Sequence, residues 1–171
     1  EIVILETARL RLRPVSGSDV DALVRLDGDP EVMRYVSGGS PTPQEVIEGW
    51  VLPRAEAERR AHRTGMWTAL DRDAGHFRGW FALRTPRHSH HPEVELSYRL
   101  AREVWGRGLA TEAAHALLDM AFRELGTERV FASTMAANRG DRRNSSRISS
   151  RRRPRSKSSV LWRLQNYINP S

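Results

Sequence analysis

The sequence predicts an α+β domain in which a mixed sheet of the α/β type is flanked by helices. Three observations support this prediction. Apolar and polar residues alternate in several short runs, as they do in half-buried strands. A long run from Leu109 has apolar residues three and four positions apart, as in an amphipathic helix. That run lies between two strand-like segments, Val94–Leu100 and Val130–Met135, and a helical connection favours parallel pairing of the two strands.

The composition indicates one globular unit. The chain has 171 residues, of which 39% are hydrophobic and 29% charged, enough for a single core. No apolar run is long enough to cross a bilayer, and Glu1–Glu6 lacks the basic region and cleavage site of a signal peptide, so we expect a cytoplasmic location without membrane association. The absence of cysteine excludes disulfides, thiolate metal ligands and cysteine nucleophiles.

The first half of the chain predicts a strand, then helices, then an antiparallel hairpin. Pro14 ends the strand because proline cannot donate to a strand ladder. Ser18 precedes an amphipathic run with early acidic residues, as at a helix start. The predicted elements are a strand over Arg9–Arg13, a helix over Asp19–Leu26, a short turn over Asp29–Tyr35, a helix from Thr42 past Trp50 with a kink or restart at Pro53, and a hairpin of Met66–Leu70 with His76–Leu83.

The strongest strand pattern comes immediately before a glycine-rich loop. In Val94–Leu100 the apolar residues alternate with Glu95, Ser97 and Arg99, so one face is apolar and the other can carry chemistry. The amphipathic run from Leu109 to Leu125 follows the loop, and Gly126 ends it as a C-terminal cap does.

The loop itself, within Trp105–Ala113, carries the chemical signal. Gly106 and Gly108 let the backbone approach a ligand closely, and the free N–H groups of the helix start form an anion site suited to a pyrophosphate. Arg107 adds a positive charge. Glycine-rich turns also close ordinary loops, so the motif decides nothing without its context.

The run Trp-Gly-Arg-Gly-Leu-Ala-Thr-Glu-Ala resembles the phosphate loop of GNAT N-acetyltransferases, in particular the branch of the RimJ and RimL ribosomal-protein acetyltransferases. The superfamily pattern is Gln or Arg, two residues, Gly, one residue, then Gly or Ala; Gly108 and Ala110 fit it, and Trp105 takes the first position. The resemblance covers about residues 5–140 and includes three further segments: Thr7–Arg13, Glu95–Leu100 and Ala137-Asn138.

This resemblance implies the GNAT acyl-CoA N-acyltransferase fold, acetyl-CoA as cofactor, and acetyl transfer to a primary amine of a protein N-terminus or a small molecule. It implies that backbone around Tyr98–Leu100 holds the acetyl and pantetheine portion, that amides of residues 106–111 hold the pyrophosphate, and that Asn138 touches the pantetheine arm. The implied cofactor-binding residues are Tyr98, Arg99, Leu100, Trp105, Gly106, Arg107, Gly108, Leu109, Ala110, Thr111 and Asn138. Met33 and Tyr35 lie where related enzymes form part of the acceptor site.

A general base is needed because an amine with a pKa near ~10 must lose a proton before it attacks a thioester. Glu95, on the polar face of the strand that enters the loop, is our candidate. The alternative is that Glu95 is a solvated or ion-paired strand carboxylate without a catalytic role. Glu93 is a second candidate base.

Other conspicuous side chains have simpler interpretations. His88, His90 and His91 have no nearby carboxylate pair, so we expect a polar loop and no metal site. Four aromatic residues line either an acceptor pocket or the core, and the core is the commoner place for aromatic side chains in strands and helices. They are Trp50, Trp67, Trp80 and Phe81.

The last segment departs from the family pattern, so we divide the chain into an acetyltransferase core, residues 1–138, and an atypical Arg/Ser-rich segment, residues 139–171. The segment has 10 basic residues and one acidic residue, a net charge of +9, whereas the remainder has a net charge of −2. The family's last helix and two strands are missing or replaced here, and the composition is typical of a partly disordered segment. Val160–Leu164 is a candidate replacement.

Two hypotheses explain this segment. It is either a genuine basic tail that binds nucleic acid, which makes the chain a catalytically impaired binding module, or the product of a reading-frame shift near residue 140. We favour the shift, because a G+C-rich gene read out of frame often encodes an aperiodic sequence rich in arginine and serine. The single lysine among 28 basic residues fits such a gene. In either case an exposed sheet edge favours a homodimer and impairs activity.

Overall fold

The computed structural model describes residues 4–86, 92–132 and 148–151. The elements are β1 (Leu5–Glu6), β2 (Leu10–Pro14), η1 (Gly17–Asp19), α1 (Val20–Asp27), α2 (Pro30–Ser37), α3 (Gln44–Val46), η2 (Ile47–Val51), α4 (Leu52–His62), β3 (Gly65–Asp71), β4 (Phe77–Arg84), β5 (Glu93–Leu100), η3 (Arg102–Val104), α5 (Leu109–Glu124), β6 (Arg129–Ala132) and β7 (Ile148–Arg151).

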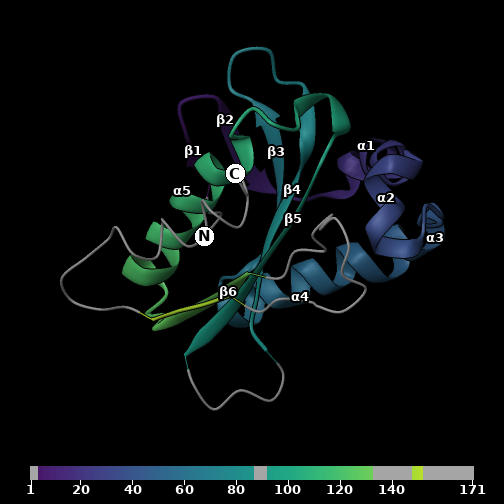
Figure 1. The fold of residues 1–171 in the computed structure, drawn as a ribbon. Helices are drawn as coiled ribbons and strands as arrows, with labels where there is room; N and C mark the ends of the chain where they lie inside the picture. Colours follow the sequence, from purple (N-terminus) through teal and green to yellow (C-terminus); the bar gives the residue numbers. More distant parts are fainter. Residues whose placement is uncertain (1–3, 87–91, 133–147, 152–171) are drawn as a thin grey trace.

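In the described ranges the strands form a seven-stranded sheet in sequence order, β1 to β7 (Figure 1). Neighbouring strands are antiparallel except β5 and β6, which are parallel. Helix α5 supplies the crossover between that parallel pair, as the sequence predicts. The mixed sheet with flanking helices is therefore confirmed.

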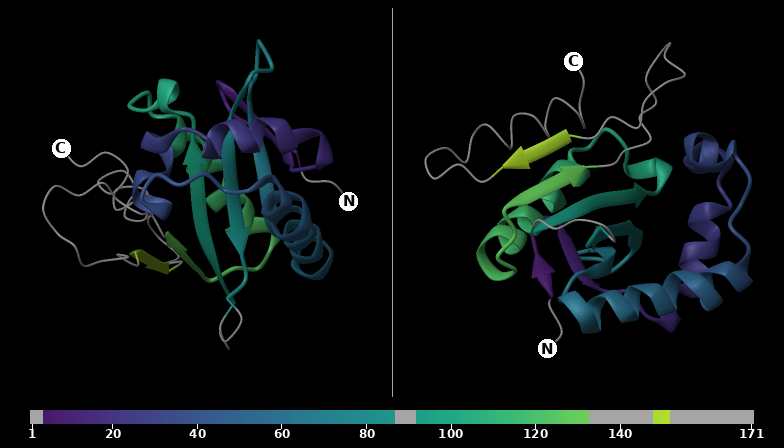
Figure 2. Two further views of the ribbon diagram at one scale, coloured as in Figure 1. Left: turned by 90° about the vertical axis from the view of Figure 1, so that its right-hand side faces the viewer. Right: turned by 90° about the horizontal axis from the view of Figure 1, so that it is seen from below.

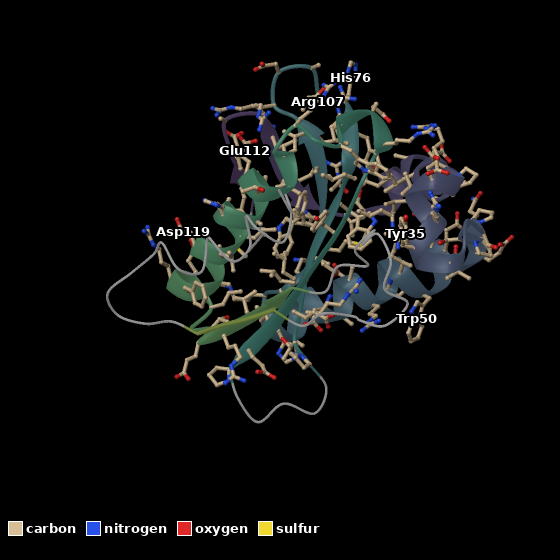
Figure 3. All side chains as sticks on the ribbon, in the orientation of Figure 1. Tyr35, Trp50, His76, Arg107, Glu112 and Asp119 are labelled. Carbon is tan, nitrogen blue, oxygen red and sulfur yellow. The ribbon has the colours of Figure 1, made fainter. Side chains whose placement is uncertain are left out.

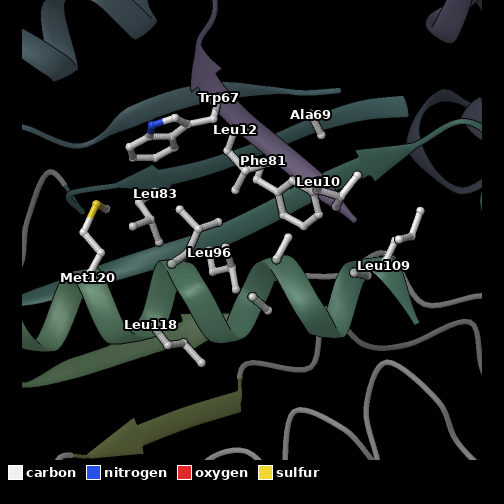
Figure 4. Packing of buried hydrophobic residues seen from close by; sticks show 14 of the residues in the cluster. Leu10, Leu12, Trp67, Ala69, Phe81, Leu83, Leu96, Leu109, Leu118 and Met120 are labelled. Carbon is white, nitrogen blue, oxygen red and sulfur yellow. The ribbon is translucent and has the colours of Figure 1, made fainter. Parts of the chain in front are cut away.

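The helices cover the two faces of the sheet unequally. Helix α5 packs on one face, and α1 to α4 lie on the other (Figures 1 and 2). Ala113, Ala114 and Leu117 of α5 have no exposed surface, and the two alanines let the helix approach the strands closely. They meet leucine and phenylalanine side chains from β2, β4 and β5 (Figure 4). This packing fixes the start of α5 relative to β5.

The predicted elements agree with the structure apart from local details. The helix expected from Thr42 is α3, a π-helical turn (η2) and α4, with Pro53 in the first turn of α4. Gly126 has a φ of 65° directly after the last turn of α5, as expected for a helix-ending glycine. The sequence does not predict β1, which has only two residues.

The C-terminal segment contains one described element that the sequence does not predict. Strand β7 pairs antiparallel with β6, with Ile148 opposite Ala132. The histidines of residues 88–91, the strand end at residues 133–135, Asn138 and the candidate segment Val160–Leu164 lie outside the described residues. No helix in the described ranges is long and apolar enough to span a membrane.

Candidate functional site

The glycine-rich loop connects the end of β5 to the first turn of α5. Gly106 and Gly108 have φ values of 74° and 76°, in the left-handed region that favours glycine. Gly108 is the N-cap residue of α5, and its carbonyl accepts from Glu112 N–H at 3.0 Å. The backbone therefore turns sharply and delivers the N-terminus of a 16-residue helix to the loop.

The backbone N–H groups of this loop are available to a ligand. Within the described part of the chain, the N–H groups of residues 106–111 donate to no backbone or side-chain acceptor. A Cβ atom placed on Gly106 meets nothing within 4 Å, so there is open space beside the loop. The hydroxyl of Thr111 is buried without a hydrogen-bond partner. Unpaired donors at a helix N-terminus fit a diphosphate, so these residues fit the cofactor that the sequence implies.

The side chain of Arg9, from near the start of the chain, binds the backbone of the loop. Arg9 Nη1 donates to the carbonyl oxygen of Arg107 at 2.8 Å, and Arg9 Nε lies 3.4 Å from Glu112 Oε2. Figure 3 shows Arg107 near His76, and Glu112 in the first turn of α5. Arg9 therefore contacts both the loop and the helix that follows it.

Two aromatic contacts fix the end of β5 beside the loop. Trp105 Nε1 donates to the carbonyl oxygen of Leu100 at 2.9 Å, although the Trp105 side chain is 48% exposed. Tyr98 stacks on Phe81 of β4, with ring centroids 5.5 Å apart. The first contact connects Trp105 to the last residue of β5, and the second holds Tyr98 against β4.

Strand β5 pairs with a different part of its length on each side. The register with β6 runs from Glu93 opposite Arg129 to Leu96 opposite Ala132, whereas β4 pairs with β5 from Glu95 to Leu100. Within the described part of the chain, the register with β6 therefore ends at Leu96. The last residues of β5 lead through η3 into the glycine loop.

Glu95 lies on the face of the sheet that α1 to α4 cover. It is directly opposite Arg84 in the register. The next residues on the same face of β5 are opposite Ala82 and Trp80, which belong to the cluster of buried apolar residues that α1, α2 and η2 form with β3 and β4. Burial lowers the pKa of the Arg84 guanidinium and Arg54 lowers it further, while the carboxylates of Glu95 and Glu58 partly offset both effects. A polar, charged surface therefore adjoins Glu95, whereas Val94 and Leu96 on the opposite face pack against α5.

The remaining predicted residues fall into two groups. Met33 is 2% exposed and contributes to the core, whereas Tyr35 is 45% exposed on α2, with the Arg34 guanidinium 5.4 Å from its ring centroid. Of the four aromatic residues, Trp67, Trp80 and Phe81 are buried in the two core clusters. Trp50 is 55% exposed and lies on the same side of the molecule as Tyr35 (Figure 3).

Sequence reasoning missed three charged residues of this region: Arg9, Asp27 and Arg84. Arg9 reaches a carbonyl 98 positions away, and Asp27 pairs with Arg99 from 72 positions away, so no local spacing indicates either contact. The alternation of β4 places Arg84 on the same face as Trp80, and this was the one usable signal. Across residues 4–86, 92–132 and 148–151, no three His, Asp or Glu side chains are grouped as metal ligands.

Comparisons with known proteins agree with this geometry. The family described as "Acetyltransferase (GNAT) domain" matches residues 9–148. The FsC-acetyl coenzyme A-N(2)-transacetylase of Aspergillus fumigatus is 33% identical over 147 residues, which are 81% of this chain and 60% of that protein. This chain thus spans about three fifths of the length of that relative.

Solved structures show the same fold. An acetyltransferase from Agrobacterium tumefaciens is 29% identical, with a TM-score of 0.64 over 77% of this chain and 74% of that one. The ribosomal-protein alpha-N-acetyltransferase RimL, solved in complex with coenzyme A, has a TM-score of 0.64 at 19% identity, over 77% of this chain and 73% of that one. The matched family spans most of the described residues, so the chain belongs to the GNAT acetyltransferase family, whose members use acetyl-CoA.

Proposed function

We propose that this chain transfers the acetyl group of acetyl-CoA to a primary amine of a protein N-terminus or a small molecule. The observation that carries the proposal is the set of unpaired N–H groups at residues 106–111, at the start of α5. The name of the Aspergillus relative, a coenzyme A N(2)-transacetylase, supports a nitrogen acceptor.

Acetyl-CoA supplies an activated thioester and a thiol leaving group whose pKa of about 8.5 makes departure easy. The protein's residues do the rest. N–H groups of the loop and the first turn of α5 bind the diphosphate. A backbone N–H near the end of β5 donates to the oxyanion that would develop on the carbonyl. Glu95, directly or through water, takes the proton from the ammonium form of the acceptor, which then attacks as the free amine.

Binding and turnover test this proposal directly. Isothermal titration should give a micromolar dissociation constant for acetyl-CoA. Thiol release with a primary amine can be followed with a thiol reagent without background, because the protein has no cysteine. The absence of acetyl-CoA binding, together with salt-sensitive RNA binding, would instead favour the binding module with a basic tail.

The role of Glu95 is tested with a pair of variants on the same face of β5. Glu95→Gln should lower kcat by about 100-fold, the usual contribution of a general base, without changing the dissociation constant of acetyl-CoA. Glu93→Gln is the matched variant, since Glu93 lies 3.6 Å from Arg129 in an ion pair near the far end of the strand. A loss confined to Glu93→Gln assigns the base to Glu93, and a loss in neither removes both from the mechanism.

A further inference from the structure

We propose that Arg9 is a positioning residue for coenzyme A: it holds the Arg107–Gly108 peptide so that the Gly108 N–H faces the diphosphate. This inference rests on the proposed function, because it concerns the same binding loop. In this role Arg9 acts through the backbone of the loop and does not take part in the reaction.

The hydrogen bond from Arg9 fixes the orientation of one peptide plane. Arg9 Nη1 donates to the Arg107 carbonyl oxygen at 2.8 Å, a short charge-assisted bond. In a trans peptide the carbonyl and the following N–H point in opposite directions. The Gly108 N–H therefore points away from Arg9, and no described group accepts from it.

The same guanidinium also contacts the first turn of α5. Arg9 Nε lies 3.5 Å from Glu112 Oε1 and 3.4 Å from Glu112 Oε2, and the Glu112 N–H in turn donates to the Gly108 carbonyl. The Glu112 side chain is 19% exposed and carries a negative charge close to the proposed diphosphate position. The positive charge of Arg9 offsets that charge, which would otherwise oppose anion binding at the helix start.

The backbone favours glycine at position 108, because a φ of 76° is strained for other residues. An ideal Cβ atom on Gly108 lies 3.6 Å from Arg9 Nη2, so the guanidinium already covers that side of the loop. The space beside Gly106 is open, by contrast. Arg9 therefore lies behind the loop as a support, and the ligand side stays free.

Arg11 provides a matched control. Its side chain is 51% exposed, as is that of Arg9, and its Nε also faces a glutamate, with 3.8 Å to Glu6 Oε1. Arg9→Gln should weaken coenzyme A binding in titration calorimetry by about tenfold, the cost of one charge-assisted hydrogen bond. Arg11→Gln should bind coenzyme A as the wild type does. Equal dissociation constants for the two variants would overturn the inference.

Two further measurements separate positioning from other roles. Arg9→Lys keeps the charge but loses the planar fork that reaches both acceptors, so it should remain close to Arg9→Gln in affinity; full rescue by lysine would reduce Arg9 to a charge and overturn the positioning role. Acetyl-pantetheine lacks the diphosphate, so its kcat/KM should be the same in wild type and Arg9→Gln. An equal loss of kcat/KM with acetyl-CoA and with acetyl-pantetheine would indicate general damage to the fold and would also overturn the positioning role.

The wild-type titration keeps the two proposals apart. If the wild type binds coenzyme A and Arg9→Gln binds equally well, only the role of Arg9 is wrong. If the wild type does not bind coenzyme A, the proposed function fails, and this inference fails with it.

Discussion

Arg99 and Asp27 form an ion pair between strand β5 and the end of helix α1, with 2.7 Å between Arg99 Nη1 and Asp27 Oδ1. The two side chains are only 19% and 7% exposed, and the Arg99 guanidinium lies 5.1 Å from the ring centroid of Trp80. Two residues after Asp27, Asp29 pairs with Arg102 at 3.3 Å. The turn between α1 and α2 is thus attached to β5 through Arg99 and to η3 through Arg102.

Asp27→Asn should weaken the binding of the amine but not the binding of acetyl-CoA, because the resemblance implies that part of the acceptor site is on α2. It removes the charge from a buried pair, so we expect a loss of about 2–3 kcal/mol in the free energy of unfolding. The Michaelis constant for the amine should rise because α1 and α2 are less firmly held, whereas the dissociation constant of acetyl-CoA should not change. Urea unfolding and steady-state kinetics measure both effects. Asp21→Asn, an exposed position on the same helix, is the control and should match the wild type.

A second prediction concerns the backbone conformation of the loop. Gly108→Ala should weaken acetyl-CoA binding by about tenfold or more, because alanine is strained at a φ of 76° and the loop must shift to relieve that strain. Gly126→Ala is the matched control: its φ of 65° imposes a similar strain, but no atom lies within 4 Å of its Cβ, and it is at the far end of α5. Both variants should lose about 1 kcal/mol of stability. Calorimetric titration should show weaker binding for Gly108→Ala alone, and a similar weakening in both would refute this account.

The sequence was most informative where local periodicity determines the structure. The alternation in Val94–Leu100 predicts both the strand and the face that carries Glu95, because side chains in a strand point alternately to opposite faces. The apolar spacing predicts a helix from Leu109 to Leu125, and α5 ends one residue earlier, at Glu124. Both patterns are set by residues a few positions apart.

The sequence was uninformative where distant residues or backbone pairing decide. Arg9 alternates like any strand residue, and its contact with Arg107 exists only because the sheet brings β2 beside the start of α5. Strand β7 contains one apolar residue in Ile148–Arg151, so its composition gives no strand signal. It is a strand because its backbone pairs with β6, and backbone hydrogen bonds do not depend on side-chain type.

Asp19 is a second buried carboxylate with a full set of partners, and it connects η1 to β2 and β3. It is 4% exposed, and it accepts from both Arg13 Nη atoms at 2.7 and 2.9 Å, from the Thr68 hydroxyl at 2.8 Å and from Ser16 N–H at 2.9 Å. Burial alone would raise the pKa of Asp19. The bonds from Arg13, Ser16 and Thr68 outweigh burial and hold its pKa below the ordinary value of 3.8.

The depressed pKa of Asp19 predicts how stability depends on pH. A carboxyl group whose pKa is lower in the folded state stabilises the fold above its unfolded pKa of about 3.9, and that stabilisation is lost as the pH falls through the folded pKa. Asp19→Asn should therefore cost about 3 kcal/mol at pH 7, where the charged partner Arg13 loses its carboxylate. Urea unfolding of wild type and variant from pH 7 to pH 2 should show the difference shrinking below about pH 4. A difference independent of pH would contradict the assignment.

Gly79 is a point of close backbone contact between β4 and β5. Its φ is 143°, and a Cβ atom placed on it would overlap the Arg99 carbonyl oxygen and lie 2.8 Å from Leu100 Cα. Gly79 lies opposite Leu100, and this pair is at one end of the register between β4 and β5. The two strands can approach this closely only because position 79 has no side chain.

Gly79→Ala should therefore damage both the fold and the site. The methyl group collides with backbone atoms, which cannot rotate away as a side chain can, so Arg99 and Leu100 must move; we expect a loss of about 2–4 kcal/mol in the free energy of unfolding. In the protein that remains folded, kcat should fall because the end of β5 shifts and with it the backbone N–H that we propose as the oxyanion donor. Gly49→Ala is the control, since nothing lies within 4 Å of its Cβ and it sits in the helical turn η2, where alanine is favoured over glycine. Thermal unfolding and single-turnover kinetics compare the two variants. If Gly79→Ala unfolds at the same temperature as Gly49→Ala, β4 and β5 can separate without cost, and the rigid placement of the β5 backbone beside the thioester is wrong.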